Sequence, residues 1–161
     1  MNQTYIHLLI THLPVFGSIL GGLVLAQGLF TKSDQTKIAA YTIFIISAVG
    51  AGIAYLTGEA AEESVEDLQG IVEETIKLHE DFALFALISL IILGLASIVG
   101  LFLTLRKSLL TRAAALIVLF ISLVSFGLVA RAGYLGGKIR HTEISNGTTD
   151  PADNLEKEAD D

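Results

Sequence analysis

Long apolar stretches without charged residues alternate with short polar segments along the chain. The four longest stretches span residues 5–31, 38–58, 82–105 and 113–130. A helix needs roughly 20 mostly apolar residues to cross a bilayer, and each stretch is about that long. A soluble fold could not bury four such segments in a chain of 161 residues. The pattern therefore predicts an integral membrane protein with four transmembrane helices.

The polar segments between the stretches predict where the helices end. The expected spans are residues 5–30, 38–57, 79–105 and 111–136. Pro14 lies inside the first span and removes a backbone donor, so we expect a kink in the turn from Ile10 to Pro14. Helices joined by short connectors lie antiparallel. The predicted fold class is an all-α, up-down four-helix bundle.

The connector between the second and third spans is longer than the other two. From Glu59 to Leu78 its apolar residues recur at helical spacing with glutamates between them. This pattern is typical of an amphipathic helix at the membrane interface. Residues 1–141 then form the transmembrane domain. The tail, residues 142–161, is acidic and poor in large apolar residues, so it is predicted to be disordered.

Charge is distributed unequally between the two ends of the bundle. Both termini and the long connector share one end, called side A, and the two short connectors share the other, called side B. Side B carries five bases and one acid: Lys32, Lys37, Arg106, Lys107, Arg112 and Asp34. The positive-inside rule then predicts that side B is cytoplasmic and that both termini face the periplasm or its equivalent. A net charge of −7 argues against nucleic acid as a partner.

Several kinds of chemistry are excluded by missing residues and motifs. The chain has no cysteine, which excludes disulfides, zinc–thiolate sites, cysteine-bound iron–sulfur clusters and covalently attached c-type haem. It also lacks a P-loop, a G-x-S-x-G motif and a dinucleotide-binding fingerprint. Nothing in the sequence therefore suggests hydrolytic or nucleotide chemistry.

All four histidines are expected at side A. His7 and His12 lie in the first turns of the first span, His79 opens the third span, and His141 follows the fourth. Ionisable residues inside transmembrane helices are usually functional, and His12 lies about two turns deep. An offset of five residues places His7 and His12 about 140° apart, which favours two separate centres over one zinc ion.

Ligation by two histidines is a standard way to hold b-type haem. One hypothesis is therefore electron transfer by a b-type cytochrome, an electron carrier or redox subunit rather than a stand-alone enzyme. In this hypothesis His12 is paired with His79, and His7 is paired with His141. His12, as the deepest ligand, is expected to matter most. Arg131 and Arg140 are placed to bind haem propionates. The opposing interpretation is that the histidines are unrelated residues tolerated at the interface.

Small residues could provide room beside such a haem. Gly17 and Gly21 form one G-x-x-x-G pair, and Gly133 and Gly137 form another. Both pairs predict close packing between helices. The second pair lies just before His141, where a flat macrocycle could approach the backbone.

Two further hypotheses stay open. Glu59 and Glu63 lie on one helical face, and with His7, His12, His79 and His141 they could hold zinc, manganese, copper or non-haem iron. Alternatively, the chain is a scaffold subunit of a larger membrane complex, in which the histidines have no role.

The segment His7-Leu-Leu-Ile-Thr-His12-Leu-Pro14 resembles the H-P-L-L-V-H-F-P opening of a bacterial four-helix membrane family, catalogued as domain of unknown function 2231. The histidine opening the third span and the glycine pair before His141 also fit, and residues 55–63 resemble a Bacteroidetes-type subgroup. The resemblance covers about residues 5–144 and departs at Leu8, where the family usually has proline.

The resemblance implies a four-helix membrane fold and a set of four histidines. Members of the family can be joined to cytochrome c or Rieske-type domains, which implies a redox partner of that kind. The expected partners are thus the lipid bilayer, such a redox protein and a second copy of the chain.

Overall fold

The computed structural model describes residues 3–58 and 73–140. Within these ranges the chain is helical. The helices are α1 (Gln3–Ile10), α2 (His12–Phe30), α3 (Asp34–Leu56), α5 (Glu73–Leu105) and α6 (Thr111–Arg140). Together they provide four apolar spans long enough to cross a membrane, with α1 and α2 forming the first. The predicted four-helix fold is therefore confirmed.

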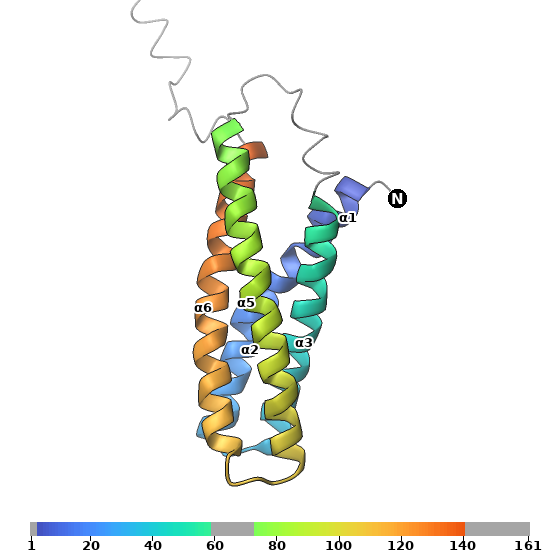
Figure 1. Cartoon of the computed structure of the whole chain (residues 1–161). Helices are drawn as coiled ribbons and strands as arrows, with labels where there is room; N and C mark the ends of the chain where they lie inside the picture. Colours follow the sequence, from blue (N-terminus) through green and yellow to red (C-terminus); the bar gives the residue numbers. More distant parts are fainter. Residues whose placement is uncertain (1–2, 59–72, 141–161) are drawn as a thin grey trace, which may run out of the picture.

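The spans run up and down side by side (Figure 1). Helix α2 packs against α3 and α6, and α5 packs against the same two helices, so α2 and α5 are diagonal neighbours. The interfacial helix predicted from Glu59 to Leu78 lies mostly outside the described residues. Its last part, from Glu73 onward, belongs to α5.

Three helix ends extend beyond the predicted limits. Helix α3 begins at Asp34 rather than at residue 38, because the Ser33 side chain accepts a hydrogen bond from the backbone N–H of Thr36 and caps the helix. Helix α5 begins six residues earlier than predicted, and α6 ends four residues later. Apolar patterning marks only the part of a helix inside the hydrocarbon layer, whereas charged turns outside that layer can stay helical.

The first span is interrupted at Thr11, as the position of Pro14 predicted. Proline has no backbone N–H, so the carbonyl of Ile10 lacks its usual helical donor. Helix α1 therefore follows its own direction and lies beside the end of α3 (Figure 1). The interruption is what brings His7 to α3.

Both side B connectors turn in the same way. Lys32 and Lys107 have φ of 55° and 51°, in the left-handed region. The next residue in each case donates its backbone N–H to a carbonyl five residues earlier, Ser33 to Gly28 and Ser108 to Leu103, at 3.0 Å. This is the hydrogen-bond pattern of a Schellman motif. Two tight turns therefore hold the helix pairs antiparallel at side B.

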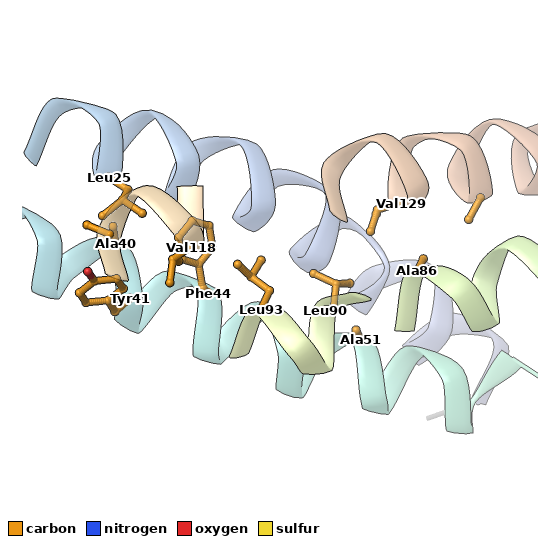
Figure 2. Close-up of a cluster of buried hydrophobic side chains, with 12 residues drawn as sticks. Leu25, Ala40, Tyr41, Phe44, Ala51, Ala86, Leu90, Leu93, Val118 and Val129 are labelled. Carbon is orange, nitrogen blue, oxygen red and sulfur yellow. The ribbon is translucent and has the colours of Figure 1, made fainter. Parts of the chain in front are cut away.

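The bundle interior is narrow and is filled by few large side chains. Figure 2 shows Tyr41, Phe44, Leu90 and Leu93 packed between the helices, and all four are buried. Small hydroxyl residues complete the interior. These are Ser18, Ser47, Ser97, Ser122 and Ser125. In contrast, most large apolar side chains point outward. Extensive exposed apolar surface of this kind requires lipid around it, so the chain is a multi-pass membrane protein.

The two predicted glycine pairs behave differently. A side chain at Gly17 would collide with Ser47, and one at Gly21 would come within 2.5 Å of the Phe44 ring, so this pair allows α2 and α3 to pack closely. Around Gly133 and Gly137 nothing among the described residues lies within 4 Å of an added Cβ. Close packing at the second pair is therefore not found among the described residues.

Candidate functional site

His7 is held by the end of α3. Its Nδ1 lies 2.8 Å from the backbone oxygen of Ala54 and 3.4 Å from Thr57 Oγ1. The last carbonyls of a helix lack intrahelical donors, so the Ala54 oxygen can accept a bond from outside. Because a carbonyl only accepts, Nδ1 carries the hydrogen, and the lone pair of the neutral ring is on Nε2. Gly58 lies beside the ring, where an added Cβ would be 3.6 Å from Cε1.

His79 is held in the same manner by α6. Its Nδ1 lies 2.9 Å from the backbone oxygen of Ala132, which fixes the hydrogen on Nδ1 and leaves the lone pair on Nε2. The ring lies against Gly136, where an added Cβ would be only 3.1 Å from Cε1. The missing side chain at Gly136 therefore lets the imidazole reach the backbone of α6.

The structure places His7 and His79 at the same end of the bundle, side A. His7 comes from α1 and is anchored on α3, whereas His79 comes from α5 and is anchored on α6. The two half-buried imidazoles thus involve four helices, and in the described part of the chain both Nε2 atoms are without a hydrogen-bond partner. Such an arrangement can offer two nitrogen ligands to one metal centre.

His12 lies elsewhere, in contrast to its predicted pairing with His79. Its side chain is exposed, its Nδ1 lies 2.9 Å from the oxygen of Leu8 in the preceding turn, and its ring stacks on Phe16 with 6.4 Å between centroids. Phe16 is itself 57% exposed. Both rings therefore lie on the outer surface of the first span. The depth of His12 along the helix did not reveal that its side chain points outward.

Arg131, a predicted propionate ligand, contacts aromatic rings in the structure. Its guanidinium lies over the rings of Phe82 and Tyr134. At about 100° per residue, Arg131 points about 100–140° away from the face of α6 that carries Ala132 and Gly136, whereas Phe82 lies within one turn of His79 on α5. The propionate role of Arg131 therefore stays a prediction.

The remaining predicted ligands cannot be placed. His141, Glu59 and Glu63 lie outside the described residues, as does the side chain of Arg140. Within residues 3–58 and 73–140, no three or more His, Cys, Asp or Glu side chains gather closely enough to hold a metal ion. The site that the structure describes consists of two histidines.

Sequence reasoning missed the groups that anchor these histidines. The Ala54 and Ala132 oxygens are backbone atoms and leave no side-chain signal. The small residues Ala132 and Gly136, four apart on α6, are the only sequence trace of the contact.

Comparisons with protein-family models, curated proteins and solved structures gave no match to this chain. The family resemblance therefore stays a prediction.

Proposed function

We propose that the protein is a small membrane electron carrier that holds haem b between His7 and His79. The observation that carries this proposal is the shared anchoring of the two imidazoles, with each Nδ1 bound to a carbonyl and each Nε2 without a partner among the described residues. Haem iron takes at most two axial ligands from the protein, whereas a structural zinc ion takes four. Two histidines at the same end of the bundle therefore fit haem better than a non-haem metal.

The carbonyls of Ala54 and Ala132 would also influence the chemistry of the site. A hydrogen bond from Nδ1–H to a carbonyl fixes the ring orientation and makes Nε2 a stronger donor. When bound, haem supplies a one-electron iron(III)/iron(II) couple. Anchoring each ligand on a second helix would limit movement of the rings when the charge on the iron changes.

The proposed location follows from the charge asymmetry. Side A, where His7 and His79 lie, would face the periplasm of a bacterial inner membrane. A cytochrome c or Rieske-type protein would then be the partner in electron transfer, as the family resemblance implies.

The decisive experiment is a reduced-minus-oxidised absorption spectrum of protein purified after expression with added haem precursor. We expect a sharp cytochrome α band that is lost in His7→Ala and in His79→Ala. His12→Ala is the matched control and should retain the band, because its ring is bonded within its own span. In this expectation His7 and His79 are essential and His12 is not. The depth of His12 in the first span predicted the opposite, namely that His12 matters most. Retention of the band in His79→Ala would refute the proposed ligand pair.

Elemental analysis of the same preparation separates the alternatives. Stoichiometric zinc, manganese, copper or iron without haem would favour a mixed site that includes Glu59 and Glu63. Absence of any cofactor, with full membrane assembly after replacement of the histidines, would favour the scaffold hypothesis.

A further inference from the structure

A cluster of cations and aromatic rings lies on α5 and α6 near side A. The Arg131 guanidinium lies 5.6 Å from the ring centroids of both Phe82 and Tyr134. Lys138 Nζ lies 5.1 Å from the Tyr134 centroid. Two positive charges therefore converge on one ring, and Arg131 connects the two helices.

On α6, this cluster faces away from the residues that contact His79. Tyr134 is 52% exposed and lies about 160° around α6 from both Ala132 and Gly136. Arg131 is exposed as well, whereas Phe82 is half-buried and lies one turn from His79 on α5. The charged groups of the cluster therefore lie on the outer surface of the bundle.

The position along α6 places the cluster at the depth of lipid headgroups. The span Thr111–Lys138 has 28 residues, which corresponds to about 42 Å at 1.5 Å per residue. This matches the thickness of a bilayer with its headgroups, about 40–45 Å, and exceeds the hydrocarbon core of about 30 Å. Shared equally between the two ends, the excess of about 12 Å places about the last turn of the span among headgroups on side A, and the Arg131 side chain, about one turn deeper, can extend to that level.

The charges of the cluster are not neutralised by the described part of the protein. There, the single ion pair within 4.0 Å joins Lys37 and Asp34, far from the cluster on side B. Glu80 and Asp81 precede Phe82 but make no such pair with Arg131 or Lys138. Two cations held side by side, with no carboxylate paired to them among the described residues, favour a bound anion.

We propose that Arg131, Lys138, Tyr134 and Phe82 bind the phosphate group of an anionic phospholipid. The apolar surface next to the cluster suits its acyl chains. Phe85 lies one turn from Phe82 on α5, and Val124 lies two turns from Arg131 on α6, and both are exposed towards the hydrocarbon layer. A basic site between two transmembrane helices is a known way to recognise such lipids.

Native mass spectrometry of the full chain in detergent, titrated with phosphatidylglycerol or phosphatidylcholine, tests this proposal. We expect tighter binding of phosphatidylglycerol. The double variant Arg131→Gln with Lys138→Gln should bind it about 30-fold more weakly, about fivefold for each cation. Arg106→Gln is the matched control, because Arg106 lies 5.2 Å from the single ring of Phe102 at side B, and its effect should be below twofold.

Equal binding of the two lipids by the unmodified protein would overturn the proposal, whether or not the double variant folds. Competition by glycerol phosphate at the same concentration as the lipid would also overturn it, because a free anion would then suffice. Circular dichroism of the variants confirms that their helices are intact before binding is compared.

Discussion

At the scale of single residues, Gly136 controls how closely His79 approaches α6. An added Cβ would lie 3.1 Å from Cε1 and 3.4 Å from Nδ1 of the imidazole. The contact with Cε1 is tighter than an ordinary van der Waals distance, so the ring would have to move by a few tenths of an ångström. The hydrogen bond from Nδ1 to the Ala132 oxygen would be strained by that movement.

Gly136→Ala is therefore expected to weaken haem retention about fivefold, because one hydrogen bond contributes about 1 kcal/mol. Gly137→Ala is the control, since nothing among the described residues lies within 4 Å of its added Cβ. Haem per protein and the thermal midpoint without haem would be measured for both variants. Identical behaviour of the two would show that the contact with His79 has no energetic role.

The residues of the site were only partly predictable. Alternation of the helices correctly placed His7, His12 and His79 at one end of the bundle. The direction of each ring was not predictable, because the helix interruption at Thr11 changes the rotation between α1 and α2 by an amount that spacing does not give. His7 therefore points to α3, while His12 points outward.

At the scale of helices, close contact between α2 and α3 depends on the absence of a side chain at Gly21. Gly21→Ala would bring a methyl group within 2.5 Å of the fully buried Phe44 ring, which cannot move aside. We expect a loss of about 1–3 kcal/mol of stability from overpacking. Unfolding in mixed detergent, followed by circular dichroism, measures this change.

Gly133→Ala provides the comparison, because its surroundings are open among the described residues. It should be neutral or more stable by up to about 1 kcal/mol, since alanine favours the helix. Equal destabilisation by both substitutions would mean that helix propensity, rather than contact with Phe44, determines the result.

The turn between α5 and α6 offers a test of backbone strain. Lys107 has φ of 51°, a conformation that costs a residue with a side chain about 1–2 kcal/mol. Lys107→Gly should therefore raise the thermal midpoint, with the gain limited to about 1 kcal/mol by the greater freedom of glycine in the unfolded chain. The comparison is Arg106→Gly, which also removes one positive charge but at a residue whose φ is not positive. This substitution should lower the thermal midpoint.

The existence and order of the helices followed from the apolar stretches, but their ends did not. The spans were predicted from apolar stretches about as long as the hydrocarbon layer is thick. The Ser33 cap and the charged first turns of α5 lie outside these stretches. Likewise, two identical G-x-x-x-G spacings gave one close contact and one open surface. Spacing identifies a helix face that could pack, whereas the partner across that face decides whether it does.

At the scale of the whole molecule, polarity is arranged in the opposite sense to that of a soluble protein. Serine hydroxyls lie in the interior, and bulky residues such as Phe30, Phe102 and Phe120 point outward. The sequence predicted this class because four apolar spans leave too few polar residues to cover the surface. It could not predict how the two helix pairs meet at side A, because that geometry depends on the break at Thr11 and on contacts with backbone atoms.

Orientation in the membrane is the property on which the proposed electron partner depends, and the absence of cysteine makes it directly measurable. Tyr5→Cys would place a thiol near the side A end of the first span, and Leu109→Cys would place one on the fully exposed side B turn. Five bases against one acid on side B predict that this turn is cytoplasmic. A membrane-impermeant maleimide applied to intact spheroplasts should therefore label Tyr5→Cys and not Leu109→Cys, and permeabilisation should expose both. Labelling of Leu109→Cys alone would place His7 and His79 on the cytoplasmic side, where a periplasmic cytochrome c or Rieske-type protein could not reach them.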